Sequence, residues 1–177
     1  MSKVDKFSVD FYLTKYIYEV REGITALVVV PWYDLRHDVT AVVFDSSFAV
    51  YGVRDMSYWF YSFTMLAEVS GIRYVAGATG IRHLFNSCSA MTWLDLRGFS
   101  LGEGADMYMT FGGCSGLLTM TVDSDWVMPA TLESNYATFY NCTKLVGGNG
   151  TKYSSSRISA AYMVIDSDAT PGYLTAG

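Results

Sequence analysis

Three cysteines and two histidines are the side chains of this chain that could act together as nucleophile and base. The cysteines are Cys88, Cys114 and Cys142, and the histidines are His37 and His83. Thiol catalysis needs a thiolate beside an imidazole, but neither histidine lies at a recognisable catalytic spacing from a cysteine. An odd number of cysteines argues against a complete disulfide framework, and Cys-x-x-Cys pairs and zinc-type spacing are absent. We therefore expect neither a catalytic thiol nor a metal site.

Two further patterns could support chemistry, and simpler interpretations account for both. The carboxylate pairs Glu103/Asp106 and Asp123/Asp125 could supply an acid and a base, but nothing in the sequence indicates their burial, and we expect a solvated surface. Residues 147–150 (Gly-Gly-Asn-Gly) lack the Lys-Ser/Thr of a phosphate-binding loop and do not open a helix after a strand, so turn formation explains them. The sequence predicts a protein that is not an enzyme and that uses no cofactor.

Composition and charge narrow the choice of partner. Hydrophobic residues make up 51% of the chain and charged residues 16%, which is typical of an ordered protein with a core. The net charge of −5 and the scattered Lys and Arg residues argue against a nucleic-acid partner. No stretch approaches the roughly 18 to 20 apolar residues of a membrane span. The first fifteen residues show no apolar segment of a signal peptide, so we leave the location open.

The spacing of the cysteines indicates an internal repeat. They lie 26 and 28 residues apart, within the pattern Phe-x-x-Cys-[Ser/Thr]-x-[Leu/Met]. Its copies begin at Phe60, Phe85, Phe111 and Phe139. In the first copy Phe63 stands in the place of the cysteine. Because phenylalanine can replace a packing residue but not a nucleophile, we interpret the cysteines as buried structural thiols.

Each repeat predicts a helix followed by a strand. Leu117, Met120 and Val122 have the Leu-x-x-Leu-x-Leu spacing of a leucine-rich-repeat strand. An apolar residue four positions before the phenylalanine, such as Ile81 before Phe85, is typical of one helical face. Stacking would bury the apolar faces that a single unit leaves exposed. We therefore predict an α/β repeat, a short leucine-rich-repeat solenoid of roughly four units of about 26 residues each.

The flanking segments are predicted to cap this solenoid within one structural domain. Residues 1–55 form the N-terminal α/β cap, with an amphipathic helix over 8–22 and strands over 25–32 and 39–44. Residues 56–146 form the repeats. Residues 147–177 form a β-type C-terminal cap, in which 161–166 and 171–174 make a short strand pair or hook.

The repeat resembles the BspA-like leucine-rich-repeat family of bacterial surface proteins. Residues 84–96 follow that family's Met-Phe-x-x-Cys-x-x-Leu core and its Leu-Asp-Leu-Ser-like strand closely. Residues 42–48 resemble the way such arrays begin, and residues 142–151 the way they end, so the resemblance covers about 39–177. It implies display at a bacterial cell surface or secretion, with adhesion or host interaction as the function, and it implies no particular ligand.

Outward-facing and aromatic residues make up the predicted binding surface. Tyr and Trp dominate binding hot spots, and here they occupy loop and helix positions that the family fills with Ser, Thr and Asn. The candidate surface consists of Tyr58, Tyr61, Glu68, Trp93, Asp95, Arg97, Tyr108, Thr119, Thr121, Asp123 and Trp126. We expect a protein partner, and homo-oligomerisation through the same aromatic surface is an alternative. The other functional hypotheses are a phage-encoded, diversified or designed recognition protein that acts without secretion, and an enzyme.

Overall fold

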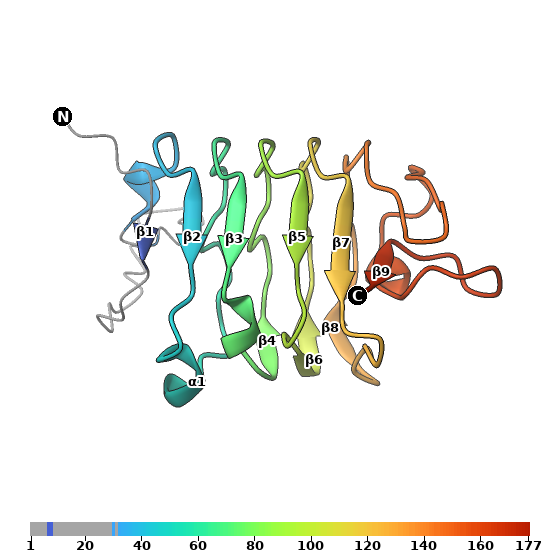
Figure 1. Cartoon of the computed structure of the whole chain (residues 1–177), viewed down its shortest axis with the longest axis horizontal. Helices are drawn as coiled ribbons and strands as arrows, with labels where there is room; N and C mark the ends of the chain where they lie inside the picture. Colours follow the sequence, from blue (N-terminus) through green and yellow to red (C-terminus); the bar gives the residue numbers. More distant parts are fainter. Residues whose placement is uncertain (1–6, 9–29, 31) are drawn as a thin grey trace, which may run out of the picture.

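Short parallel strands, one from each coil of the chain, lie side by side along the molecule (Figure 1). The computed structural model describes residues 7–8, 30 and 32–177, and the structural statements below refer to these residues. They form a β-solenoid of about three turns with a repeat of about 27 residues. The prediction of a stacked solenoid is confirmed, with fewer complete turns than the predicted number of units.

The regular elements are short. In chain order they are β1 (Phe7–Ser8), the 3-10 helix η1 (Tyr33–Leu35), β2 (Ala41–Val43), α1 (Phe48–Tyr51), β3 (Glu68–Ser70), the 3-10 helix η2 (Ile72–Tyr74), β4 (Ala78–Gly80), β5 (Trp93–Asp95), β6 (Leu101–Asp106), β7 (Thr119–Val122), β8 (Leu132–Ser134), the 3-10 helix η3 (Ala160–Tyr162) and β9 (Leu174–Ala176). No helix in this part of the chain has the length and apolar character needed to pass through a bilayer.

Two sides of the solenoid are parallel β-structure. On one side β1, β2 and β3 are hydrogen-bonded in that order, and β5, β7 and β9 continue the same row (Figure 1). On a second side β4, β6 and β8 are paired. Ala41 stands opposite Glu68, and Trp93 stands opposite Thr119, so one coil advances the chain by 27 or 26 residues. Equivalent positions of successive coils therefore lie next to each other, which builds rows of similar side chains along the molecule.

Alternation along the strands separates core from surface. In β7 the side chains of Met120 and Val122 are buried, whereas those of Thr119 and Thr121 are half-buried on the outer face. This is the period of two that a strand with one buried face requires. The predicted inward and outward positions of this strand are confirmed.

A column of phenylalanine rings and thiols fills the middle of the core. The rings of Phe60, Phe85, Phe111 and Phe139 stack in that order with centroids 5.7, 6.2 and 5.6 Å apart. Each buried thiol donates a hydrogen bond to a phenylalanine carbonyl of the preceding coil. The Sγ–O distances are 3.3 Å for Cys88 to Phe60, 3.0 Å for Cys114 to Phe85 and 3.0 Å for Cys142 to Phe111. The prediction of free, buried structural thiols is confirmed.

The third side of each coil is a run of tight turns, so the predicted helix in each unit is wrong. In the run 81–87, the backbone N–H groups that donate to carbonyls of the next coil belong to Ile81, His83, Phe85 and Ser87. His83 and Ser87 also have φ values of 52° and 66°, and such left-handed residues recur in the runs of the other coils. A helix needs bonds within its own segment and right-handed φ throughout. The bonds between coils and the left-handed residues together exclude it, and α1 is the one α-helix among the described residues.

The N-terminal prediction is tested in part. The predicted strand over 39–44 is confirmed as β2. The predicted helix over 8–22 and the predicted strand over 25–32 lie outside the described residues, apart from Ser8, Val30 and Trp32. The indole Nε1 of Trp32 donates to the Trp59 carbonyl at 2.8 Å, which ties this segment to the first repeat.

The C-terminal segment closes the solenoid with a strand from the end of the chain. β9 pairs in parallel with β7, where a further repeat would place its own strand. Ile165 and Leu174 form a parallel bridge, in which the Leu174 N–H donates to the Val164 carbonyl and the Asp166 N–H to the Leu174 carbonyl. The predicted pairing of 161–166 with 171–174 is therefore present as one short parallel bridge. Residues 160–162 are a 3-10 helix instead of a strand.

A buried carboxylate organises this closure. Asp166 accepts hydrogen bonds from the N–H groups of Asn149, Thr151 and Gly172 at 2.9, 2.9 and 3.1 Å and from the Thr151 hydroxyl at 2.6 Å. Burial alone raises the pKa of Asp166, but the hydrogen bonds from Thr151, Gly172 and Asn149 outweigh burial and hold the pKa below its usual value. The Gly-rich turn at 147–150 is therefore structural, as predicted.

Replacing this carboxylate is expected to destabilise the C-terminal end. Asp166→Ala removes the acceptor of the buried Gly172 N–H and of the partly buried Asn149 and Thr151 N–H groups, and we expect the free energy of unfolding to fall by about 3 kcal/mol. Urea denaturation measures the loss. Asp168→Ala is the control, because Asp168 is exposed and accepts one bond, from the Asn149 side chain at 2.7 Å. Equal losses in the two variants would contradict the role assigned to Asp166.

Candidate functional site

The predicted binding residues do not form one patch but divide between two sides of the solenoid. Glu68, Trp93, Asp95, Thr119 and Thr121 lie on the side of the solenoid that contains β3, β5 and β7, and Arg97 and Asp123 follow strands of that side. Tyr58, Tyr61 and Tyr108 lie on the side made by the runs of turns. Trp126 belongs to neither group. The residues of each group are close together because equivalent positions of successive coils lie side by side.

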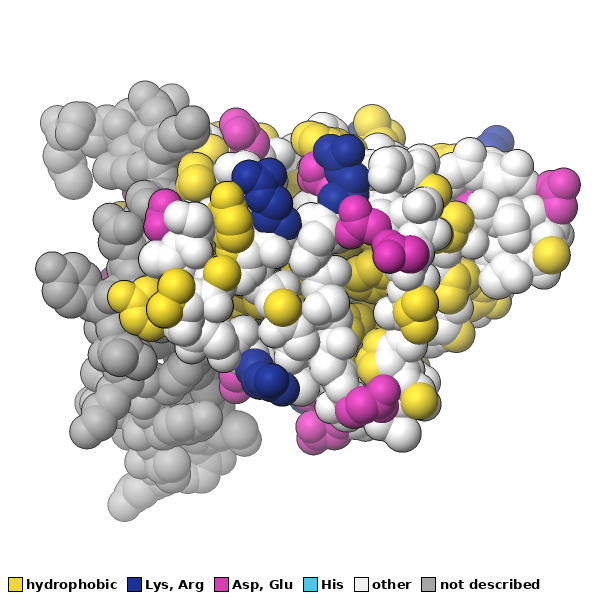
Figure 2. Space-filling model, turned by 60° about the horizontal axis from the view of Figure 1, so that its bottom comes forward, with side chains coloured by type: hydrophobic (Ala, Val, Ile, Leu, Met, Phe, Trp, Pro, Cys, Tyr) yellow, Lys and Arg dark blue, Asp and Glu magenta, His cyan; other side chains and the backbone are white. Residues whose placement is uncertain are grey.

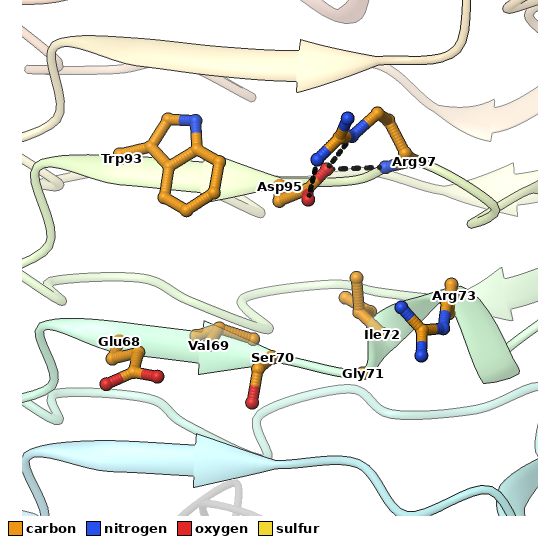
Figure 3. Close-up of a pocket in the computed structure, with 9 residues that line it drawn as sticks. All are labelled: Glu68, Val69, Ser70, Gly71, Ile72, Arg73, Trp93, Asp95 and Arg97. Atoms are coloured by element: carbon orange, nitrogen blue, oxygen red, sulfur yellow. Dashed lines mark hydrogen bonds and ion pairs between the residues drawn. The ribbon is translucent and has the colours of Figure 1, made fainter. Parts of the chain in front are cut away.

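The sheet residues meet around a hollow between β3 and β5 (Figure 3). Its volume is about 450 Å³. It is lined by Glu68, Val69, Ser70, Gly71, Ile72, Arg73, Trp93, Asp95 and Arg97. Four of the predicted surface residues, Glu68, Trp93, Asp95 and Arg97, thus share one concavity. Sequence reasoning missed Arg73, which stands three residues after the end of β3. Gly98 stands three residues after the end of β5 and lies beside it: a Cβ added to Gly98 would be 2.7 Å from the Cβ of Arg73.

Charged groups alternate at the carboxyl ends of these strands. Arg97 binds Asp95 through two guanidinium nitrogens, Nε and Nη2, at 2.9 and 2.8 Å (Figure 3). The side-chain bonds from Arg97, with Arg73 also nearby, hold the pKa of Asp95 below its usual value. Asp123 accepts the Gly98 N–H at 2.6 Å. The Asp95 carboxylate is thus bonded by Arg97 and the Asp123 carboxylate by a backbone N–H. We therefore expect both aspartates to stabilise the local structure and not to bind a ligand.

Threonines cover the sheet beside the hollow. The Trp93 indole Nε1 donates to the Thr121 hydroxyl at 3.1 Å, which fixes the indole over the sheet. The Thr119 and Thr175 hydroxyl oxygens are 3.3 Å apart. Trp93 still has 49% of its surface exposed and is the largest accessible apolar group beside the hollow.

An aromatic strip runs along the turn side. We define it by six rings in continuous contact: Tyr33, Tyr58, Tyr61, His83, Tyr108 and Tyr136. Centroid distances along the strip are 6.5 Å (Tyr33–Tyr61), 6.0 Å (Tyr61–Tyr58), 4.8 Å (Tyr58–His83), 5.1 Å (His83–Tyr108) and 6.1 Å (Tyr108–Tyr136). The strip joins η1 to four successive runs of turns. Tyr136, at its end, is 63% exposed, and the other five side chains are half-buried.

Sequence reasoning found three of these rings and missed three. His83 stands two positions before Phe85, as Tyr58 does before Phe60. Tyr136 stands three positions before Phe139, the position that Tyr108 has in the preceding copy. This match of repeat positions was the signal in the sequence that could have revealed both. Tyr33 precedes the repeats and carries no such signal.

A cation and a neutral imidazole complete the strip. The Arg82 guanidinium lies 4.7 Å from the centre of the Tyr108 ring and forms an ion pair with Asp106 at 2.7 Å. Burial, together with the charge of Arg82, lowers the pKa of His83, so its imidazole is neutral at physiological pH. His83 Nδ1 is buried and has no hydrogen-bond partner in the described part of the chain. The imidazole therefore acts here as a ring that packs between tyrosines.

Trp126 is a packing residue. Its ring stacks on Phe99 with centroids 6.5 Å apart, and its Nε1 donates to the Met163 carbonyl at 3.0 Å. The indole therefore ties the loop after β7 to the C-terminal segment. The backbone N–H of Trp126 donates to the Asp123 carbonyl at 3.0 Å, but the side chain packs among residues of neither candidate group.

Neither the charges nor the thiols indicate another kind of site. In the view of Figure 2, basic and acidic side chains lie in small mixed groups and form no extended field of one sign. Burial raises the pKa of all three cysteine thiols. Among the described residues no three His, Cys, Asp or Glu side chains are grouped as metal ligands would be.

No family model, no curated protein and no solved structure matches the chain.

Proposed function

We propose that the chain is a non-catalytic protein-recognition module of the BspA-like leucine-rich-repeat kind, which binds its partner through the aromatic strip and serves adhesion at a bacterial cell surface. One observation carries the proposal. Six aromatic rings from five separate segments contact each other in an unbroken row on the outside of the solenoid.

Tyrosine suits such a surface for physical reasons. Its ring offers a large contact area, its hydroxyl a polar group, and few rotatable bonds are fixed on binding. Rings that already pack against each other lose still less conformational freedom. The side chains of the strip therefore lose little conformational entropy when a partner covers them. A row of hydroxyl-bearing rings with Arg82 at its side matches the composition of binding hot spots.

The proposal is tested by isolating a partner and locating the surface that it needs. The immobilised chain is incubated with surface proteins of bacterial and animal cells, and retained proteins are quantified by mass spectrometry. We expect Tyr61→Ser and Tyr108→Ser each to lower recovery of the specific partner about tenfold or more, because each removes a ring from the middle of the strip.

Tyr51→Ser is the matched control, because Tyr51 is an exposed tyrosine on α1 that lies off the strip. Its recovery should equal that of the unchanged chain. Melting temperatures confirm that all three variants are folded. A partner retained equally by every variant would contradict binding through the strip.

A further inference from the structure

The hollow on the sheet lies at a break in the backbone ladder. Among the strands that the structure describes on this face, every adjacent pair is hydrogen-bonded except β3 and β5, which belong to different sheets. The coil between them is also short, because Glu68 and Trp93, which begin the two strands, are 25 residues apart in the sequence. Backbone groups alternate between the two neighbours of a parallel strand, so those of Val69, Trp93 and Asp95 face the gap. The two strands nevertheless stay adjacent, with Cα atoms within 8 Å of each other, so these main-chain groups face each other and no further strand fits between them.

The two ends of the hollow carry opposite charge. Glu68 lies at the amino end of β3 and Arg73 lies beyond its carboxyl end, and both side chains are exposed (Figure 3). The Arg73 guanidinium donates to the Tyr74 hydroxyl at 3.1 Å and lies 4.9 Å from the Tyr74 ring centre. Among the described residues, no carboxylate lies within ion-pairing distance of it. Arg73 is thus the accessible cation of the hollow, since Arg97 is already paired with Asp95.

The Trp93 indole lies at the same end of the hollow as Glu68 (Figure 3). A cation placed there would meet both a carboxylate and the face of an indole, and each of these attracts an ammonium group. The opposite end would receive a carboxylate at the Arg73 guanidinium. The distance between the two charges is spanned by β3, Gly71 and η2.

We propose that this hollow binds a short peptide with free termini, about three residues long, that runs parallel to β3. Its amino terminus lies at Glu68 and Trp93, and its carboxyl terminus lies at Arg73. The peptide lies over the outer face of the two strands, between the two charged ends of the hollow. The volume of 450 Å³ falls within the usual range of small-ligand sites. The site lies on a different side of the solenoid from the aromatic strip, so the proposal is independent of the proposed function.

The tripeptide Ala-Val-Ala with free termini is the probe. It is titrated into ¹⁵N-labelled full-length chain, and the Trp93 indole N–H resonance, assigned with Trp93→Phe, is followed by NMR. We expect a saturable shift of this resonance. Amidation of the carboxyl terminus should weaken binding about tenfold, because it removes the charge that Arg73 recognises.

Two variants separate the ends of the site. Arg73→Gln should weaken the free peptide about tenfold and leave the amidated peptide unaffected. Glu68→Gln should weaken the peptide with a free amino terminus about tenfold and leave the peptide with an acetylated amino terminus unaffected. Arg54→Gln is the control, because Arg54 is an exposed arginine that does not line the hollow. Three results would overturn the proposal: no shift at Trp93, equal weakening by Arg54→Gln, or saturation by acetate alone, which would indicate a simple carboxylate site.

Discussion

Raising the pH from 9 to 10 is expected to lower the free energy of unfolding by about 3 kcal/mol, because three buried thiols must ionise when the chain unfolds. Burial raises the pKa of Cys88 and Cys114 and raises that of Cys142 to about 12. An exposed cysteine in the unfolded chain has a pKa of about 8.5. The folded chain therefore keeps its thiol protons over a range in which the unfolded chain loses them. The stabilisation is complete below about pH 8.5 and is lost as the pH rises toward the folded pKa values.

Cys114→Ser isolates the share of one thiol. The serine hydroxyl can donate to the Phe85 carbonyl but does not titrate, so the loss between pH 9 and 10 should shrink by about 1 kcal/mol. Urea denaturation at the two pH values measures it. Ser115→Ala, which changes the neighbouring residue and removes no titrating group, should keep the full loss. If Cys114→Ser and the unchanged chain lose the same stability, Cys114 is not buried as the structure places it.

The second large effect is expected at Gly71, where the backbone of the preceding coil leaves no room for a side chain. Gly71 has φ of 75°, and a Cβ added there would overlap the backbone carbonyl of Phe44 in the preceding coil. Neither backbone can move without disturbing the β2–β3 pairing. We therefore expect Gly71→Ala to lower the free energy of unfolding by about 3 kcal/mol or more, measured by urea denaturation.

Gly104→Ala is the matched comparison for this substitution. Gly104 has nearly the same φ, 73°, but a Cβ added there meets no atom within 4 Å. It should lose only the cost of a left-handed alanine, about 1 kcal/mol. The difference between the two variants measures the close stacking of the coils. Similar losses would show that the coils are not packed backbone to backbone at Gly71.

The sequence was sufficient to predict the solenoid and its core. Phenylalanine and cysteine recur at a fixed position of each coil because stacking brings equivalent positions together. The same packing requirement therefore repeats once per coil, and the sequence shows that period. The alternation of polar and apolar residues along 119–122 also predicted the strand correctly, because strand side chains alternate between the two faces. The same two signals correctly placed Trp93 and Glu68 on one outer surface.

The helix predicted in each repeat is wrong because the spacing of apolar residues does not distinguish a helix from successive tight turns. A spacing of four between Ile81 and Phe85 fits a helical face, but two successive tight turns produce the same spacing. The turns depend on left-handed His83 and Ser87. Histidine adopts positive φ more often than most residues, but still in a small fraction of its occurrences, so neither residue alone predicts this conformation. At the position of Ser87, the third and fourth repeats have Gly113 and Asn141, residue types that favour positive φ and were the visible hints. The predicted binding residues lie on two sides of the solenoid. The sequence pattern indicates which side chains face outward, but it does not indicate which side of the coil each segment forms.

The central claim, that the aromatic strip is the recognition surface, is tested most directly by hydroxyl-radical footprinting of the chain with and without its isolated partner. The oxidation rate of each tyrosine and tryptophan side chain is read by mass spectrometry. We expect the partner to protect Tyr58, Tyr61, Tyr108 and Tyr136 and to leave Tyr51 and Trp93 unchanged. Protection of Trp93 with unchanged tyrosines along the strip would contradict the account and move recognition to the sheet.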